Sequence, residues 1–505
     1  MADLVAPLES AIEILFSGQT PMWIVIGVLI GIVAGALPGI GATLGMAIVL
    51  PLTLPLEGAD AIVLLICIYG AAMYSGSIPS ILVNVPGTAG DAATTFDGYP
   101  MAQQGKAINA LVISAVSSAA GGTVAVVMLI LVSPVLVELV LLFGSPQYFL
   151  IAILGIAMIT VVTTGSTVKG LTAGAFGLLL ATIGVAPTVP VQRYTFGQLA
   201  LLDGLNYIAI LIGLFAIAEM IRLAREKQVS RSDSETGLEG SVVSGIKSVL
   251  KHPIVVLKSS AIGLLVGAVP GSGAAISNFI AYGEAMRSSK TPERFGTGTG
   301  EGVVATDAAN NATVGGALIP TFSFGIPGSG STAVLLGGLI MHGLRPGPDL
   351  FTTQLDITYS VFMAIFAANV VILLLGIFVI PRTGYLTQID TDVIIPVVIV
   401  LSMLGALALR NNWIDVWTVF ALGIVGFFMK KHNYSVIAFV MGAILGPIAE
   451  ENLYRSLSIS GGSIDIFLED PLSLSLIAAI VLILLGPTIR TTIEKWRAGG
   501  RRKVS

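Results

Sequence analysis

Gly35-Ala36-Leu37-Pro38-Gly39-Ile40-Gly41 lies inside a long apolar run, and a similar stretch, Gly267-Ala268-Val269-Pro270-Gly271-Ser272-Gly273, lies inside another. A proline removes a backbone donor and clashes with the preceding turn, so we expect the apolar helices to break at Pro38 and at Pro270. Each break frees backbone N–H and C=O groups that hydrocarbon cannot satisfy, so it must pack against protein or line a wet cavity. Two matching breaks in the two halves of the chain therefore predict a solute site.

The composition sets the fold class. The chain has 505 residues, of which 55% are hydrophobic and only 11% are charged. Soluble proteins carry about 25% charged residues. The apolar segments are continuous over about 20 residues, which favours membrane helices over the alternating strands of a barrel. The sequence predicts an all-α polytopic membrane protein with about 10–14 membrane segments.

Basic residues predict the orientation in the membrane. No Lys or Arg precedes Lys106, whereas basic residues are frequent between Arg222 and Lys258 and again after Lys495. By the positive-inside rule the central linker and the C-terminus are cytoplasmic. The acidic N-terminus is expected on the other side, and because it has no basic n-region, a cleaved signal peptide is not expected.

A second correspondence supports two repeats. The stretches Pro79–Gly87 and Pro320–Gly328 share the spacing P-x₆-P-G. If the first half begins outside and the second begins inside, the repeats are inverted, and inverted repeats with broken helices are a recurrent plan of secondary transporters. The predicted domains are residues 1–225 (first transmembrane repeat), 226–252 (cytoplasmic linker) and 253–505 (second transmembrane repeat).

Four Pro-Gly stretches and the polar side chains around them form the predicted substrate site. Where a helix restarts after such a turn, its free N–H groups favour a carboxylate, so an anion can be held without Arg or Lys. The alternatives are close helix packing through glycine and interhelical hydrogen bonding, both common in membranes. The predicted substrate-binding residues are Pro38, Gly39, Gly41, Ser75, Asn84, Pro86, Gly87, Thr88, Pro270, Gly271, Ser272, Gly273, Asn310, Asn311, Thr313, Pro327, Gly328, Ser329, Ser331 and Thr332.

Asp91 and Asp307 are the acidic residues nearest the breaks. An embedded carboxylate is a candidate site for a proton or Na⁺, so both are predicted coupling-ion residues. The alternative is a position at a wet interface. Four basic side chains could attract anions to a vestibule or could be ordinary flanking charges: Lys106, Lys169, Arg193 and Arg345.

Enzyme signatures are missing, so we expect no enzyme, no metal site and no cofactor other than Na⁺ or H⁺ as coupling ion. His252, His342 and His432 are far apart and none belongs to an H-E-x-x-H motif. Gly328-Ser329-Gly330-Ser331-Thr332 lacks the lysine of a phosphate-binding loop, so ATP hydrolysis is not expected. Cys67, the single cysteine, lies in an apolar run and is predicted to be a buried thiol.

The chain resembles a known family, the large membrane subunit of the tripartite tricarboxylate transporters. The similar stretches are Gly35 to Gly45, Tyr74 to Gly87, Asp91 to Pro100 and Asn310 to Pro327, and the second is very specific. The resemblance implies a permease that works with a small four-helix membrane subunit and a periplasmic solute-binding protein. It also implies a bacterial inner membrane, a Na⁺ or H⁺ gradient, and citrate or other di- and tricarboxylates as substrates.

We therefore expect an inverted-repeat permease whose broken segments meet near mid-membrane and bind a carboxylate, with access exchanged by rigid, elevator-like motion. A passive anion channel or a structural membrane subunit is the main alternative, and an intramembrane hydrolase is a third. A bulky apolar residue in place of Asn84 or Ser329 is expected to abolish uptake while the protein still folds.

Overall fold

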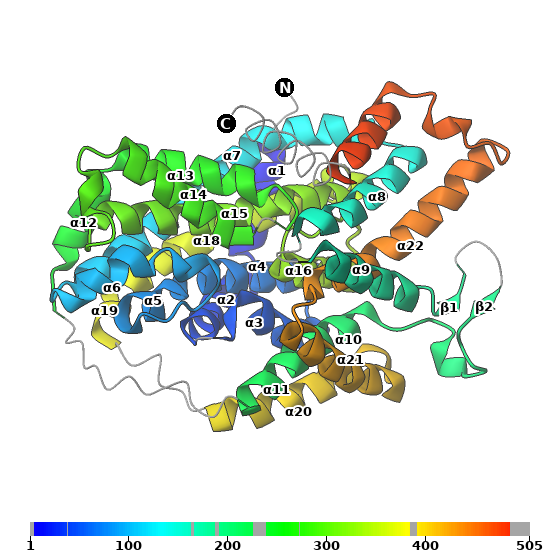
Figure 1. The fold of residues 1–505 in the computed structure, drawn as a ribbon, viewed down its shortest axis with the longest axis horizontal. Helices are drawn as coiled ribbons and strands as arrows, with labels where there is room; N and C mark the ends of the chain where they lie inside the picture. The colour runs from blue at the N-terminus through cyan, green and yellow to red at the C-terminus, as the bar shows by residue number, and fades with distance from the viewer. Residues whose placement is uncertain are drawn as a thin grey trace, which may run out of the picture. The chain divides into compact units, whose positions relative to one another are not determined.

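The computed structural model of the chain is built almost entirely from helices (Figure 1). It describes residues 5–37, 39–162, 166–186, 191–225, 239–271, 273–383 and 391–484. In these ranges the only strands are β1 (Gly184–Val185) and β2 (Gln192–Arg193), which pair in antiparallel fashion. Pro38 and Ser272, two of the predicted site residues, lie outside the described residues.

Many of the helices have the length and apolarity of membrane spans. Among the described residues six helices are long and apolar enough to cross a membrane, or up to eight if each sharply bent helix pair is one span. The prediction of an all-α polytopic fold is confirmed. The expected 10–14 segments stay a prediction, because apolar helices of 10–17 residues are too short to count here. The six helices are Gly58–Val83, Ala107–Leu141, Tyr207–Arg225, Leu355–Phe378, Trp413–Lys431 and Val436–Ile459.

The chain forms two compact units, and each is discontinuous in sequence. The first contains Met1–Val140 and Asn206–Met429, and the second contains Leu141–Leu205 and Lys430–Ser505. The predicted boundaries of the cytoplasmic linker fall inside the first unit, and part of that linker forms the helix α12 (Val242–Leu250). The predicted repeat boundaries are not tested by this division and stay a prediction.

The first half contributes one interrupted helical hairpin to the first unit. After the bend between α1 (Val5–Phe16) and α2 (Thr20–Ala36), the first helix run ends at Ala36 and the chain restarts as α3 (Gly41–Val49). It then continues through α4 (Gly58–Ser75) and α5 (Ser77–Val83), which are joined at the helical residue Gly76 and form one span. α2 packs along α4 (Figure 1).

The second half contributes the same order of elements. The bend between α12 and α13 (Pro253–Gly267) is 75°, close to the 76° bend between α1 and α2. The chain breaks after Gly267 and restarts as α14 (Gly273–Ser288), and α13 packs along α15 (Gly300–Phe324). A second break then leads to α16 (Gly330–Met341).

The turns before the second break in each half have the same backbone structure. Asn84 has a φ of 56° and Gly325 has a φ of 66°, so both adopt the left-handed conformation that commonly ends a helix. The N–H of Val85 donates to the carbonyl of Pro79, and the N–H of Ile326 donates to the carbonyl of Pro320. The P-x₆-P-G spacing therefore corresponds to a matched hydrogen-bonded turn.

Glycines bring the two breaks of each half together. A Cβ built at Gly87 would lie 2.4 Å from the carbonyl oxygen of Gly35, so only glycine fits this contact. In the second half Gly328 lies against Gly267 in the same way, but more loosely, at 3.4 Å. The four Pro-Gly stretches thus form two matched pairs of contacting turns.

The other helices of the first unit cover these hairpins. The long helix α7 approaches α15 closely, since a Cβ at Gly121 would lie 2.2 Å from the carbonyl oxygen of Ala308. The remaining described elements are η1 (Leu50–Thr53), η2 (Gly90–Ala92), α6 (Thr95–Gln103), α7 (Ala107–Leu141), α10 (Tyr207–Leu211), the π-helix η4 (Ile212–Ile217), α11 (Ala218–Arg225), η5 (Pro292–Arg294), α17 (Pro348–Phe351), α18 (Leu355–Phe378), α19 (Ile380–Thr383), α20 (Thr391–Arg410) and α21 (Trp413–Lys431).

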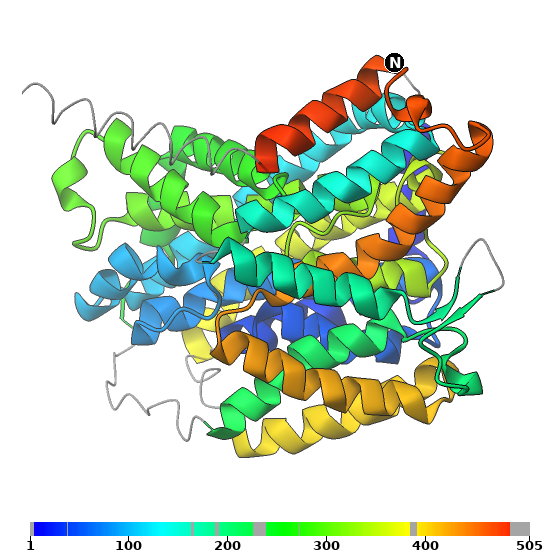
Figure 2. The ribbon, with the colours of Figure 1, turned by 45° about the vertical axis from the view of Figure 1, so that its right-hand side comes forward.

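The second unit packs helices from two distant parts of the sequence. Figure 2 shows α8 (Ser145–Val162), α9 (Thr167–Ala181) and α22 (Val436–Ile459) side by side. Glycine permits the crossing of α9 and α22, because a Cβ at Gly177 would lie 1.9 Å from the carbonyl oxygen of Phe439. The unit also contains the short elements η3 (Leu199–Leu201) and η7 (Asp465–Phe467) and the apolar helix Pro471–Leu484.

Candidate functional site

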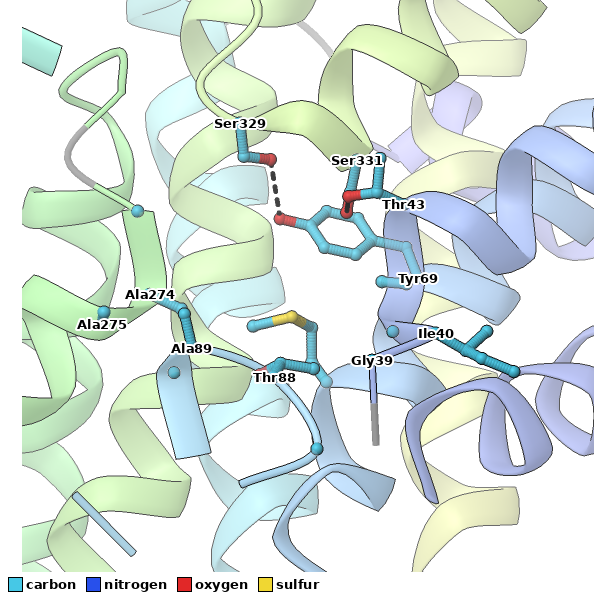
Figure 3. A pocket seen from close by; sticks show the side chains of 16 residues that line it. Gly39, Ile40, Thr43, Tyr69, Thr88, Ala89, Ala274, Ala275, Ser329 and Ser331 are labelled. Atoms are coloured by element: carbon cyan, nitrogen blue, oxygen red, sulfur yellow. Dashed lines mark hydrogen bonds between the residues drawn. The ribbon is translucent and has the colours of Figure 1, made fainter. Parts of the chain in front are cut away.

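A pocket of about 330 Å³ lies in the first unit where the four Pro-Gly stretches meet (Figure 3). Both broken hairpins contribute to its wall. Among the described residues that line it, none is Lys, Arg, Asp or Glu. They are Gly39, Ile40, Gly41, Ala42, Thr43, Tyr69, Met73, Gly87, Thr88, Ala89, Gly90, Gly273, Ala274, Ala275, Ser329 and Ser331.

Three helices begin at this pocket. Gly41 is the first residue of α3, Gly273 is the first residue of α14, and Ser329 is the N-cap of α16. The first N–H groups of a helix have no acceptor within the helix, and they carry partial positive charge. The pocket therefore collects positive potential from three helix starts, and among the described residues Arg222 lies behind the lining residue Gly39 without being part of the lining.

Hydroxyl groups join the two halves across the pocket. Thr43 Oγ1 of α3 lies 2.9 Å from Ser331 Oγ of α16, and the Tyr69 hydroxyl lies 3.5 Å from Ser329 Oγ. Both contacts are visible as dashed lines in Figure 3. Ser329 and Thr332 also form a reciprocal capping box at the start of α16. The second-half turn is thus fixed in position by hydrogen bonds from both halves.

Asp91 lies directly behind the loop that lines the pocket. Its side chain is fully buried in η2. Asp91 Oδ2 accepts hydrogen bonds from the N–H of Thr88 at 2.9 Å and from Thr88 Oγ1 at 2.5 Å. Asp91 Oδ1 accepts from Asn310 Nδ2 at 2.9 Å and lies 3.1 Å from Ser77 Oγ. The loop of the first half is therefore bonded to α15 of the second half.

Asp307 lies beside Asp91 and is also fully buried. Ser77 Oγ contacts Asp307 Oδ1 as well as Asp91, so one hydroxyl joins the two carboxyl groups. The solvent-exposed interface considered for Asp91 does not describe either side chain. The sequence separates these two acids by more than two hundred residues, and the fold brings them to one serine.

Asp97, the third acid of this region, is bonded to a loop of the second half. Asp97 Oδ1 accepts from the N–H groups of Gly296, Gly298 and Thr299, at 2.8–3.0 Å, and Oδ2 accepts from the Tyr282 hydroxyl at 2.9 Å. With all these donors the carboxylate is fully satisfied. Asp97 therefore holds the segment before α15 in place.

The structure places the predicted substrate-binding residues in three groups. Seven line the pocket: Gly39, Gly41, Gly87, Thr88, Gly273, Ser329 and Ser331. Others lie behind the wall or in the breaks without lining it: Ser75, Pro270, Gly271, Asn310, Asn311, Thr313, Pro327, Gly328 and Thr332. Asn84 and Pro86 are exposed. A direct role in binding stays a prediction for all of them.

Three buried residues of the second group have local hydrogen-bond partners. Ser75 Oγ donates to the carbonyl of Gly31, Asn311 Nδ2 lies 3.4 Å from the carbonyl oxygen of Gly70, and Thr313 Oγ1 donates to the carbonyl of Ala309. These bonds join adjacent helices or stay within α15. They match the interhelical alternative that the sequence left open.

Several lining residues had no signal in the sequence. Thr43, Tyr69 and Met73 lie on regular parts of α3 and α4, away from any Pro-Gly stretch. Ala274 and Ala275 are small residues at the start of α14. Only the expectation that a helix start faces the solute could have drawn attention to those two.

The basic residues considered for a vestibule are divided between the two units. Arg193 pairs with Glu450 at 2.7 Å in the second unit, and this hydrogen-bonded carboxylate raises the pKa of Arg193. Lys169 donates to the carbonyl of His432, also in the second unit. Lys106 donates to Gln104 Oε1 in the first unit, and Arg345 is exposed. Local contacts explain the first three.

A polytopic helical protein whose interrupted helices meet at a polar pocket has the construction of a membrane transporter. The chain belongs to the family described as "Tripartite tricarboxylate transporter TctA family", whose model matches residues 22–441. The resemblance found in the sequence is thereby confirmed. The chain is the large membrane subunit of a transporter and not an enzyme.

The chain is also similar to two proteins of Agrobacterium vitis. It is 33% identical over 500 residues to the "Uncharacterized 52.8 kDa protein in TAR-I ttuC' 3'region", covering 98% of this chain and 99% of the relative. It is 30% identical over 232 residues to the "Uncharacterized protein in TAR-II ttuC' 3'region", covering 45% of this chain and 96% of the relative. No solved structure matches the chain.

Proposed function

We propose that this chain is the permease of a binding-protein-dependent secondary transporter that imports citrate-like di- and tricarboxylates on a Na⁺ or H⁺ gradient. Its partners would be a small four-helix membrane subunit and a periplasmic solute-binding protein in a bacterial inner membrane. The central linker and the C-terminus would face the cytoplasm, because the basic residues cluster there.

The single observation that carries the proposal is the pocket lined by all four Pro-Gly stretches. Helix breaks cost backbone hydrogen bonds in a membrane unless they serve a wet cavity. Here the breaks of both halves meet at one cavity of about 330 Å³, which is within the size range of small-molecule sites. Packing alone does not require four breaks to share one cavity.

The chemistry of the pocket fits a carboxylate. Three helices start at the cavity, where free N–H groups and positive potential favour an anion, and Thr43, Ser329 and Ser331 add hydroxyl donors. Without Lys or Arg in the lining, the substrate is held by many weak donors. Such binding is reversible, as a transporter requires.

Ion coupling would act through the loop between Gly87 and Asp91. Thr88 and Gly90 line the pocket, Thr88 donates to Asp91, and Asn278 Nδ2 of α14 donates to the carbonyl of Gly90 at 2.7 Å. A cation that neutralises the buried acids would change the contacts of this loop. It would also reduce the net charge that crosses the membrane with a polyanion.

Alternating access would follow from two inverted repeats that move as rigid bodies, in an elevator-like manner. The matched turns at Asn84 and Gly325 and the matched 76° and 75° helix bends support the presence of repeats. Discontinuous helices at a repeat interface are typical of secondary transporters.

Uptake of labelled citrate into vesicles tests the proposal. The vesicles would contain this chain and its small subunit, with and without the binding protein and an imposed Na⁺ or H⁺ gradient. Accumulation that requires both the gradient and the binding protein is expected. Equilibration without accumulation would identify a passive channel, and uptake without the binding protein would identify a self-sufficient carrier.

A further inference from the structure

One serine hydroxyl touches two buried carboxyl groups. Ser77 Oγ contacts Asp307 Oδ1 and lies 3.1 Å from Asp91 Oδ1, and all three side chains are fully buried. A serine hydroxyl carries one hydrogen, so it can donate to only one of the two. Both contacts are hydrogen bonds only if one carboxyl group brings a hydrogen of its own.

The other donors show which carboxyl group is ionised. Besides Ser77, Asp91 accepts hydrogen bonds from the N–H of Thr88, the hydroxyl of Thr88 and the amide of Asn310. Hydrogen bonds to the charged form of a carboxyl group favour that form. The hydrogen-bond donors around Asp91 therefore favour its ionised form.

Asp307 has far fewer donors. Thr94 Oγ1 lies 3.4 Å from Asp307 Oδ1, but it is closer to Thr306 Oγ1, at 3.0 Å. Thr306 in turn can donate to the carbonyl of Gly302. Asp307 Oδ2 is buried, and within the described residues it has no hydrogen-bond partner. A carboxylate with an unpartnered oxygen is expensive to bury, whereas a neutral carboxyl group is less so.

The charged and titratable groups around Asp307 also favour its neutral form. The titratable groups that face Asp307 are Asp91, from η2, and Tyr74, from α4. Ser114 of α7 also faces Asp307. Within the described residues no Lys or Arg pairs with either acid. Two unpaired negative charges at this depth would repel each other.

We propose that the coupling ion is a proton and that Asp307 carries it. The Asp307 carboxyl donates its hydrogen to Ser77 Oγ, and the Ser77 hydroxyl donates to the Asp91 carboxylate. Loading takes one proton from water onto Asp307, and release returns it to water on the other side, so only O–H bonds form and break. This inference rests on the proposed ion-coupled transport.

The donor pattern disfavours Na⁺ at the same place. A metal cation needs several oxygen lone pairs directed at it. Around Asp91 the contacts from Thr88, Asn310 and Ser77 present hydrogens instead, and among the described residues the two unpartnered oxygens beside the pair, Asp307 Oδ2 and Asn310 Oδ1, are fewer than a cation requires. Proton loading also reaches the substrate, because Thr88 both binds Asp91 and lines the pocket.

The test uses the complete transporter in vesicles with labelled citrate as the probe. In sodium-free buffer an acid-outside pH gradient should drive accumulation by the natural protein. Asp307→Asn should lower this accumulation about tenfold or more while preserving citrate exchange at equal pH, because the amide cannot carry the proton. Accumulation that needs Na⁺ and ignores pH would overturn the proposal, as would an Asp307→Asn variant that still follows the pH gradient.

A second pair of variants leaves Asp91 and Asp307 unchanged and alters one serine at a time. Ser77→Ala removes the acceptor for the Asp307 proton, so half-maximal accumulation should move to lower pH. Ser80→Ala is the matched control, because Ser80 is a buried serine of the same helix that bonds only to the carbonyl of Gly76. An unchanged pH profile in Ser77→Ala would contradict the relay. If the natural protein accumulated no citrate under either gradient, the proposed function itself would fail instead.

Discussion

The turn after Pro86 and the turn after Pro327 have the same backbone and different chemistry. Each follows a residue in the left-handed conformation and a matched hydrogen bond, Val85 to Pro79 and Ile326 to Pro320. After Pro86 the chain makes a loop and a 3-10 turn that carries a buried acid. After Pro327 it restarts at once as a helix with a neutral capping box.

This difference indicates that the turn after Pro86 and the turn after Pro327 have different functions. The first-half turn supplies Asp91 and contacts α15, where the proposed coupling ion would act. The second-half turn supplies Ser329 and the start of α16, so it is suited to hold a carboxylate. Four predictions test whether the halves differ as this comparison requires.

Gly87→Ala is expected to cause the largest loss of stability and uptake. At Gly87 a Cβ would lie 2.4 Å from the carbonyl oxygen of Gly35 and 2.6 Å from Gly76 Cα, and neither backbone atom can move easily. Gly87→Ala should therefore cost about 1–3 kcal/mol of stability and most of the uptake. Thermal unfolding of purified protein and citrate uptake measure both.

Gly328→Ala is the matched control for that variant. A Cβ at Gly328 would have Ala317 Cβ as its nearest neighbour, at 3.2 Å, which is a less severe contact than those at Gly87. We expect it to cost less than about 1 kcal/mol and to keep uptake. Equal losses in both variants would show that the two turns are packed alike and would remove the asymmetry.

The cap of α16 should give the next largest effect. Ser329→Ala removes the side chain that accepts from the N–H of Thr332, and cap removal typically costs about 1 kcal/mol. Because Ser329 also lines the pocket, the KM for citrate should rise. Ser435→Ala removes the cap of α22 in the second unit and should cost similar stability without changing KM. A KM change in Ser435→Ala, or none in Ser329→Ala, would contradict the binding role.

The contact between Thr43 and Ser331 should contribute less to stability than the cap at Ser329 does. It joins the two halves at 2.9 Å across the pocket, and a hydrogen bond contributes about 0.5–1.5 kcal/mol net. A double-mutant cycle of Thr43→Ala and Ser331→Ala, followed by thermal unfolding, should give a coupling free energy in this range. Additive effects would mean that the two hydroxyls do not bond in the stable state.

Tyr69→Phe should have the smallest effect. The Tyr69 hydroxyl is 3.5 Å from Ser329 Oγ, at the limit of a hydrogen bond, so its loss should cost only a few tenths of a kcal/mol. The ring, which forms part of the pocket wall, is retained. A loss of more than about 1 kcal/mol would show that the hydroxyl matters more than its distance suggests.

Local sequence rules predicted the parts of the site that depend on backbone geometry. Proline at Pro270 cannot continue a helix, and the P-x₆-P-G spacing of the two halves specifies the same turn twice. These signals lie within a few residues of each break. They were sufficient to place Gly87, Thr88 and Ser329 at the pocket.

Long-range packing brings other residues to the site, and no sequence motif predicts them. Thr43 and Tyr69 reach the pocket from regular helical positions, so no motif marks them. Asn84 has the left-handed conformation at an exposed helix end and does not line the pocket, so its role in substrate binding stays a prediction. The serine that joins Asp91 to Asp307 looks in sequence like any small residue of a membrane helix.

The same limitation applies to the discontinuous units. The pairing of α9 with α22 depends on glycines more than two hundred residues apart, which no local pattern connects. Hydropathy predicted that both are membrane helices. It contained no information about their partners.

The most direct measurement is substrate protection of single cysteines placed on opposite walls of the pocket. Ala89→Cys tests the first half and Ala275→Cys tests the second, while the native thiol of Cys67 is buried and serves as the unreactive background. Thr352→Cys, at an exposed position away from the pocket, is the control. Citrate should slow thiol labelling at both pocket positions and leave Thr352→Cys unchanged. If citrate protected neither pocket position, or only one, the claim that the two broken hairpins form one carboxylate site would be contradicted.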